Sequence, residues 1–209
     1  MKKYLCSLLS VLCILVLASC SYAGYYNEGH FGLTESDAYV IDSIADMIEF
    51  RDRINAGTDS EGLYYKLAGN LNLEAQTNWK PIGTGSRPFK GHFNGNGRTI
   101  KVKIAPIWTY GSALFGTVKT ESGYAIKNLT VSGAIEDRHA VAGVAMELYN
   151  ASIENCVFTG TLRSYGHQSS WSNEDLNDGP YDARAGGIIE HMFSGAIKNW
   201  VVAQNDFLS

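Results

Sequence analysis

Cysteine is scarce in this 209-residue chain, and its four cysteines leave no disulfide framework. Cys6 and Cys13 lie inside an apolar N-terminal stretch and Cys20 directly follows it, so Cys156 stands alone in the body of the chain. No Cys-x-x-Cys pair, the spacing typical of structural zinc sites, occurs. The sequence therefore excludes a small disulfide-stabilised fold and a cysteine-based metal site.

Charge is also sparse, since only 18% of the residues are charged and acids outnumber bases by 21 to 17. Loss of Lys2 and Lys3 with a cleaved N-terminal segment would change the net charge from −4 to −6. No basic patch survives, so we expect no nucleic-acid partner. Nucleophile-elbow, His-Glu-x-x-His and phosphate-binding glycine motifs are missing as well. We expect neither a cofactor nor a metal ion.

Glycine and aromatic residues are plentiful, with 22 Gly, 12 Tyr and 8 Phe. Together with the low charge, this composition favours a β-rich extracellular protein over a helical cytosolic one. The length suits one domain with a sizeable core. We therefore expect a single all-β domain.

The first residues have the pattern of an export signal. Lys2 and Lys3 form a basic start, and residues 8–18 form an apolar stretch that is too short to span a membrane. The sequence Leu17-Ala18-Ser19-Cys20 resembles a bacterial lipobox, which implies cleavage after residue 19 and acylation of Cys20. The alternatives are ordinary signal cleavage after Ala23, which would release a soluble protein, and an uncleaved anchor.

These features predict three regions: a lipoprotein signal peptide over residues 1–19, a flexible tether over 20–39, and a folded domain over 40–209. We expect the mature protein to be exported and lipid-anchored at the cell envelope, exposed at the surface, with the lipid as its only membrane contact.

One helix is predicted over residues 43–56. Ser43 can cap it with Asp46 as its capping-box partner, and Gly57 can end it. The expected apolar stripe consists of Ile44, Met47, Ile48, Arg51 and Ile54. Such a helix would cover the open end of the first strands.

Residues 79–100 show the clearest pattern in the chain. Alternation from Phe89 to Gly97 predicts extended backbone, and Gly95-Asn96-Gly97 predicts a tight turn at its end. The spacing of Trp79, Pro81-Ile82-Gly83, Phe89, Gly91, Phe93, Gly95, Gly97 and Ile100 resembles the segment that opens GLUG-type repeat domains of bacterial surface and secreted proteins. The resemblance covers roughly residues 41–202 and implies a right-handed parallel β-helix.

An internal repeat follows, in which Ile-x-Asn recurs at Ile126, Ile153 and Ile197. We expect its asparagines to face inward, to bend the chain in the left-handed conformation and to form a ladder of stacked amides. The repeat predicts these stacked columns: Ile126/Ile153/Ile197, Leu129/Cys156/Trp200 and Val131/Phe158/Val202. Cys156 would then be an apolar core residue.

The repeat spacing of 27 residues rises to 44 between Ile153 and Ile197, and the surplus falls in residues 164–182. This window combines aromatic rings, which stack on sugars, with carboxylates, which accept hydroxyl hydrogens. It lacks the spacing of a calcium-binding loop. An ordinary solvated loop remains the alternative. The candidate ligand-binding residues are Tyr165, Trp171, Glu174, Asp175, Asp178, Tyr181 and Asp182.

A carboxylate pair is a second candidate site. Aligning Ala142-Gly143 with Ala185-Gly186 places Glu147 over Glu190 on neighbouring strands, with His191 nearby. Adjacent strands lie ~4.8 Å apart, close to the carboxyl separation of a retaining glycosidase. Any residue pair in one column shares that spacing, so the pair is only an alternative catalytic site.

The sequence thus favours a non-catalytic, adhesin-like or glycan-binding surface module. The alternatives are a polysaccharide-degrading enzyme and a structural stalk or assembly subunit that associates end to end through its open C-terminal strands. The expected partner is an extracellular glycan or a host or cell-surface ligand.

Overall fold

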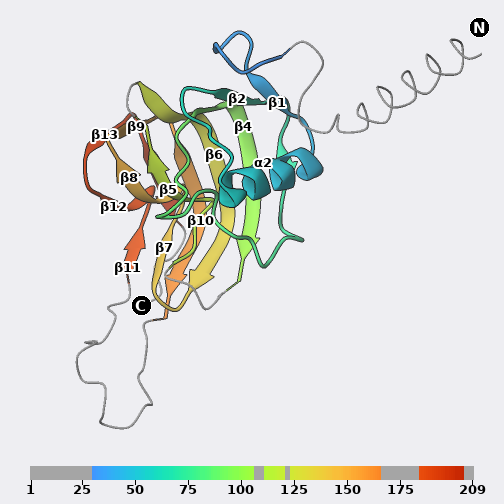
Figure 1. Ribbon diagram of the computed structural model, residues 1–209. Coiled ribbons are helices and arrows are strands. Elements are labelled where there is room, and N and C mark those ends of the chain that lie inside the picture. The colour runs from blue at the N-terminus through green and yellow to red at the C-terminus, as the bar shows by residue number, and fades with distance from the viewer. Residues whose placement is uncertain (1–29, 106–110, 121–122, 166–183, 205–209) are drawn as a thin grey trace, which may run out of the picture.

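The computed structural model describes residues 30–105, 111–120, 123–165 and 184–204 (Figure 1). These residues form one α-helix and many strands, so the described chain is mostly β-structure. The elements are β1 (Tyr39–Ile41), α2 (Ile44–Ala56), β2 (Tyr64–Leu67), β3 (Leu71–Asn72), β4 (His92–Ile104), β5 (Phe115–Lys119), β6 (Tyr124–Asp137), β7 (Ala140–Ala142), β8 (Ala145–Tyr149), β9 (Ala151–Glu154), β10 (Val157–Ser164), β11 (Arg184–Gly186), β12 (Ile189–Met192), β13 (Gly195–Lys198) and β14 (Val201–Gln204).

The described strands pair in parallel throughout. The main sheet has the order β1-β2-β4-β6-β10-β14, with β3, β9 and β13 paired alongside. A second sheet has the order β5-β8-β12, and β7 pairs with β11. In the main sheet, each later pass of the chain pairs with an earlier pass, and we call each pass a layer. The expected all-β class is confirmed, because the described residues form mostly parallel strands and a single helix.

The repeat predicts two of the core columns correctly. Ile153 pairs with both Ile126 and Ile197, and Phe158 pairs with both Val131 and Val202. Ile126, Val131, Ile153 and Phe158 are fully buried. Polar residues such as Thr130 and Ser132 alternate with them on the other side, which is the period of two that a half-buried strand requires.

The asparagines of the repeat form the expected ladder of amides, but on the outside. Asn128, Asn155 and Asn199 all have positive φ, between 49° and 52°. Asn155 donates to the Asn128 side chain at 3.0 Å, and Asn199 donates to Asn155 at 3.1 Å. Asn155 and Asn199 are exposed and Asn128 is half-buried, so the expected inward orientation is wrong. The left-handed bend turns these side chains away from the core while it carries the apolar residues on either side back into it.

The third column is only partly as expected. Leu129 and Cys156 are buried, whereas Trp200 is 55% exposed. The same contrast occurs in the second sheet, where Leu148 is fully buried and its partner Met192 is 48% exposed. Both exposed residues lie in the last layer, over which no described residue packs. Burial therefore depends on the layer above as well as on the column.

The tight turn expected at Gly95-Asn96-Gly97 is not found, and no strand ends there. β4 continues from His92 through to Ile104, and its register with β6 shifts between Asn94 and Arg98. Asn96 and Gly97 both have positive φ, which only glycine and a few polar residues adopt easily. Between Asn94 and Arg98, β4 has more residues than the facing part of β6, and the excess forms a bulge. This bulge lies beside the bend that β6 makes at Asn128.

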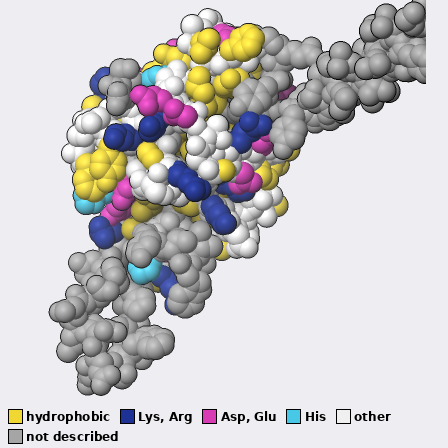
Figure 2. Space-filling model, viewed as in Figure 1, with side chains coloured by type: hydrophobic (Ala, Val, Ile, Leu, Met, Phe, Trp, Pro, Cys, Tyr) yellow, Lys and Arg dark blue, Asp and Glu magenta, His cyan; other side chains and the backbone are white. Residues whose placement is uncertain are grey.

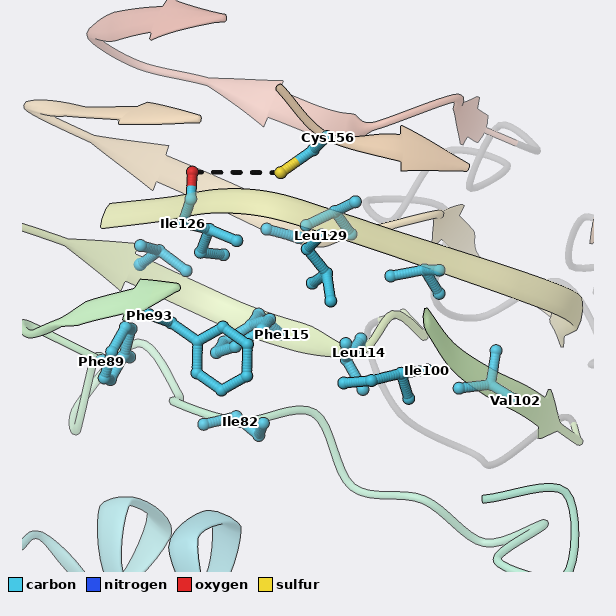
Figure 3. Packing of buried hydrophobic residues seen from close by; sticks show 14 of the residues in the cluster. Ile82, Phe89, Phe93, Ile100, Val102, Leu114, Phe115, Ile126, Leu129 and Cys156 are labelled. Carbon is cyan, nitrogen blue, oxygen red and sulfur yellow. Dashed lines mark hydrogen bonds between the residues drawn. The ribbon is translucent and has the colours of Figure 1, made fainter. Parts of the chain in front are cut away.

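The helix is confirmed at its predicted position. Ser43 caps α2 and forms a capping box with Asp46, and Gly57 ends it in the left-handed conformation. Its buried residues are Met47, Phe50 and Ile54, whereas Ile44 is 39% exposed. Figure 3 shows α2 below the segment that carries Ile82, with the buried side chains above it. The helix thus covers the apolar end of the first layers.

Residues 30–39 pack against the sheet instead of extending the tether. The Tyr64 amide donates to the Gly32 carbonyl at 2.8 Å. Glu35 accepts from Asn94 at 2.7 Å and pairs with Lys127 at 2.7 Å, and the Lys127 hydrogen bond lowers the pKa of Glu35. The predicted signal peptide, Cys20 and the start of the tether lie outside the described residues. No helix in the described ranges has the length and hydropathy needed to cross a membrane.

Candidate functional site

A long groove of about 920 Å³ follows the sheet β5-β8-β12 and reaches the C-terminal end of α2. Each layer contributes a few side chains to it, so residues far apart in sequence lie along one continuous depression. Its lining consists of Asn55, Asn78, Lys80, Pro81, Gly83, Thr84, Gly85, Gly111, Gly116, Thr117, His139, Ala140, Met146, Glu147, Arg184, Glu190 and His191.

Strand register places three polar side chains in a row across the groove. Thr117 of β5 pairs with Glu147 of β8, which pairs with His191 of β12. Because the strands are parallel and adjacent, neighbouring members of the row are about 4.8 Å apart along the stack. The residues that follow Thr117 and Glu147, Val118 and Leu148, are fully buried, so Thr117 and Glu147 point away from the core. We call Thr117, Glu147 and His191 the polar row.

The register also corrects the expected carboxylate pair. Glu147 lies beside His191, and Glu190 occupies the preceding position on β12. The Ala-Gly alignment is offset by one residue, because Ala142 pairs with Gly186 and not with Ala185. Glu147 and Glu190 both line the groove, but they do not occupy equivalent positions on neighbouring strands.

Each groove carboxylate already has a partner within the protein. The Thr117 hydroxyl donates to Glu147 Oε2 at 2.9 Å. Arg184 Nη1 donates to Glu190 Oε1 at 2.9 Å, and the Glu190 side chain is only 8% exposed. Both carboxylates thus already bind a side chain of the protein itself. The arrangement supports recognition better than acid–base chemistry.

Three stacked aromatic rings lie beside the polar row. The His191 ring stacks on Phe193 with ring centroids 4.3 Å apart and an interplanar angle of 10°. Phe193 stacks in turn on Tyr149 at 4.3 Å and 9°. Hydrophobic and histidine side chains accordingly gather over β12 at the left edge of the molecule in Figure 2. Loss of water contact and the neighbouring Glu147 charge raise the pKa of Tyr149, so this ring stays neutral. We call Tyr149, His191 and Phe193 the ring stack.

Glycines bring the layers close together at the floor of the groove. A Cβ on Gly116 would overlap the Gly83 carbonyl oxygen. Gly83 itself has a φ of 85°, and its amide donates to the Asn55 side chain at 2.8 Å. Asn55 also donates to the Pro81 carbonyl at 3.0 Å. The C-terminal end of α2 thereby fixes the first layer of the groove.

The surplus window of residues 164–182 falls almost entirely outside the described residues. Of the seven ligand-binding candidates only Tyr165 is described, and Trp171, Glu174, Asp175, Asp178, Tyr181 and Asp182 are not. Tyr165 is 46% exposed, its hydroxyl donates to Glu136, and Arg163 lies 4.8 Å from its ring centre. The bond to Glu136 raises the pKa of Tyr165. Arg184, the first residue described after the window, lines the groove.

Cys156 occupies the core as expected. It is fully buried, and its thiol lies 4.0 Å from the Ile126 carbonyl oxygen (Figure 3). Burial raises the pKa of Cys156 to about 12. A thiol held neutral in this way is a poor nucleophile at physiological pH. Within the described ranges, no group of three or more His, Cys, Asp or Glu side chains is placed to hold a metal ion.

Sequence reasoning misses several lining residues, notably Thr117, Lys80 and Arg184. None belongs to a motif, and only the fold brings them together at the groove. One signal for His191 is present in the repeat: counting back from the Ile-x-Asn anchor puts Glu147 and His191 at the same place, six residues before Ile153 and Ile197.

Comparison with known proteins finds no family model, no curated protein and no solved structure that matches this chain.

Proposed function

We propose that this protein is a non-catalytic binding module of the cell surface that holds a glycan in the groove along β5, β8 and β12. The observation that carries the proposal is the groove itself, which is lined by the polar row, whose member His191 stacks on Phe193 just outside the lining. Sugars present both hydroxyl groups and flat C–H faces, and a site for them needs both kinds of partner.

The architecture belongs to the same proposal. Parallel pairing of every described strand, repeated return to the same sheets and an external asparagine ladder support a right-handed parallel β-helix of the GLUG type. In such a fold the groove would run parallel to the stacking axis, because each layer adds one step to its wall.

The proposal also includes export and a lipid anchor at Cys20, and the pattern Leu17-Ala18-Ser19-Cys20 supports both. Cys20→Ala should abolish acyl labelling and move the protein from the detergent phase into the aqueous phase. Labelling that persists in Cys20→Ala, or a mature wild type that begins at Gly24, would refute the anchor.

The enzyme alternative receives less support from the groove. A retaining glycosidase needs one carboxylic acid and one carboxylate facing each other across the scissile bond. Glu190 is instead paired with Arg184, and strand pairing puts His191 rather than Glu190 opposite Glu147.

End-to-end assembly of many copies is also less favoured, because α2 covers the end of the stack that carries β1 and β2. In the described part of the chain, the layer that carries Met192 and Trp200 is the uncovered one, and a single uncovered end does not support a filament of many copies.

A glycan array combined with a reducing-sugar assay tests the proposed function. We expect the mature chain to bind at least one glycan class and to release no reducing ends from it. Replacing residues 164–182 by a short Gly/Ser turn separates the groove from the window: loss of all binding in a normally folded protein would assign the site to the window. Sugar release that Glu147→Gln abolishes would instead establish the enzyme.

A further inference from the structure

We propose that the groove selects uncharged, linear oligosaccharides that lie along the stack of strands, with the polar row and His191 of the ring stack as the recognition residues. This inference rests on the proposed function and specifies the ligand class for the same site.

The first step concerns the length of the ligand. The groove crosses four successive layers, represented by Gly83, Gly116, Met146 and Glu190. Three steps between adjacent strands amount to roughly 14 Å. A single sugar ring cannot fill that span, whereas an extended oligosaccharide can contact every layer. Affinity should therefore increase with the number of sugar units and then reach a plateau.

The second step concerns the polar row. One Glu147 oxygen accepts from Thr117, and the other has no partner among the described residues. A carboxylate oxygen in this position accepts a hydrogen bond from a hydroxyl, and a charged acceptor forms the stronger type of hydrogen bond. Thr117 holds the carboxylate in place, so little conformational freedom is lost when a sugar binds.

The third step concerns the stacking surface. One face of the His191 ring is covered by Phe193, and His191 also lines the groove. Phe193 is held from its other side by Tyr149, so the ring stack keeps His191 in a defined orientation. A rigid ring beside a hydrogen-bonding carboxylate suits a sugar, whose C–H face packs on the ring while its hydroxyls reach the acceptor.

The fourth step concerns charge. Glu147 and Glu190 place two carboxylates in the groove, and the Arg184 charge is already paired with Glu190. Lys80 lines the opposite end, next to α2, and has no ion-pair partner in the described part of the chain. The lining thus holds two acids and two bases, so a uronic-acid or sulfated chain would gain no net attraction and would bring negative charge against Glu147, which favours uncharged sugars over acidic ones.

Calorimetric titration with two size series tests this inference. The neutral series runs from glucose to cellopentaose and from mannose to mannopentaose, and the acidic series consists of oligogalacturonates of the same lengths. The variants are Glu147→Gln, which keeps the shape but removes the charge, and His191→Ala. Lys119→Ala is the control, because Lys119 lies on β5 outside the groove lining. Melting curves check that each variant folds.

We expect a neutral series to bind with affinity that rises with length, about tenfold weaker in Glu147→Gln and in His191→Ala, and unchanged in Lys119→Ala. Tighter binding of oligogalacturonates than of both neutral series would overturn the inference and leave the proposed function standing. Neutral binding that both groove variants retain at full strength would also overturn it. Binding of neither class, with an array that is blank as well, would refute the proposed function too.

Discussion

Asn155 donates its side-chain amide to the oxygen of Asn128 in the layer below, and both residues hold the left-handed backbone conformation. The two features serve different purposes. Positive φ bends the chain so that apolar residues on both sides reach the core, whereas the amide bond links neighbouring layers at the surface. Because Asn155 is exposed, we expect the backbone to contribute more stability than the amide bond.

Substitutions at Asn155 separate these contributions. Asn155→Leu should cost about 1–2 kcal/mol of unfolding free energy, because a leucine is strained at positive φ. Asn155→Gly keeps the bend and loses only the amide, so it should cost less. Chemical denaturation measures both. A glycine variant as unstable as the leucine variant would mean that the amide ladder contributes more stability at this position than the backbone bend.

Phe50 should be the most important residue of α2. Its ring contacts Tyr65, Phe89 and Phe93 at centroid distances of 4.7, 5.6 and 5.8 Å. Phe50→Ala should therefore destabilise the fold by about 3–5 kcal/mol. Ile44→Ala, on the exposed side of the same helix, should cost about 1 kcal/mol or less. Equal melting temperatures for the two variants would contradict the packing of α2 on the first layers.

The two groove glycines Gly116 and Gly85 make a matched pair. A Cβ on Gly116 would meet the Gly83 carbonyl, whereas a Cβ on Gly85 would have nothing within 4 Å. Gly116→Ala should force the layers apart at a cost of about 1–3 kcal/mol, and Gly85→Ala should be close to neutral. Thermal unfolding compares them. If Gly116→Ala is as stable as wild type, the layers cannot be tightly stacked at this point.

Cys156 should make the fold sensitive to high pH. Its thiol has a usual pKa near 9, and burial raises the pKa of Cys156 in the folded chain to about 12. The unfolded chain therefore loses this proton first, and stability should decline as the pH rises from about 9 towards 12. Cys156→Ala lacks the group, so its stability should decline less over that range. Parallel curves for wild type and Cys156→Ala would show that the thiol is not buried in the folded chain.

Sequence reasoning predicts the parts of this fold that depend on local signals. Ser43, Asp46 and Gly57 satisfy helix ends through their own chemistry, so the bounds of the helix follow from them. The Ile-x-Asn repeat likewise fixes the strand register from Ile126 to Ile153 and Ile197. In both cases the residue type and the backbone conformation are linked directly.

The remainder depends on contacts that no local pattern contains. The asparagines face outward because a residue at positive φ redirects its side chain, and alternation of strand residues does not reveal this. Trp200 is exposed because no described residue packs over its layer. Phe50 is buried although the expected stripe omits it, and Ile44 is exposed although the stripe includes it. Only the position of the first layers decides which side of the helix is covered.

The groove is the clearest example of a feature that sequence hides. Glu147 and Glu190 line the same groove, but the Ala-Gly anchor puts the wrong residue opposite Glu147. Adding the 44-residue spacing of the Ile-x-Asn repeat to Glu147 gives His191, which is the residue that pairs with Glu147. Thr117 and Arg184 enter the site only through pairing of strands that are distant in sequence.

The location of a bound ligand tests the central claim most directly. A crystal structure of the protein with the tightest-binding oligosaccharide from the array would provide it. We predict sugar density along the sheet β5-β8-β12, with one sugar ring over His191 and a hydroxyl within hydrogen-bond distance of Glu147. Density on another face of the molecule, with the groove free of sugar, would contradict the account.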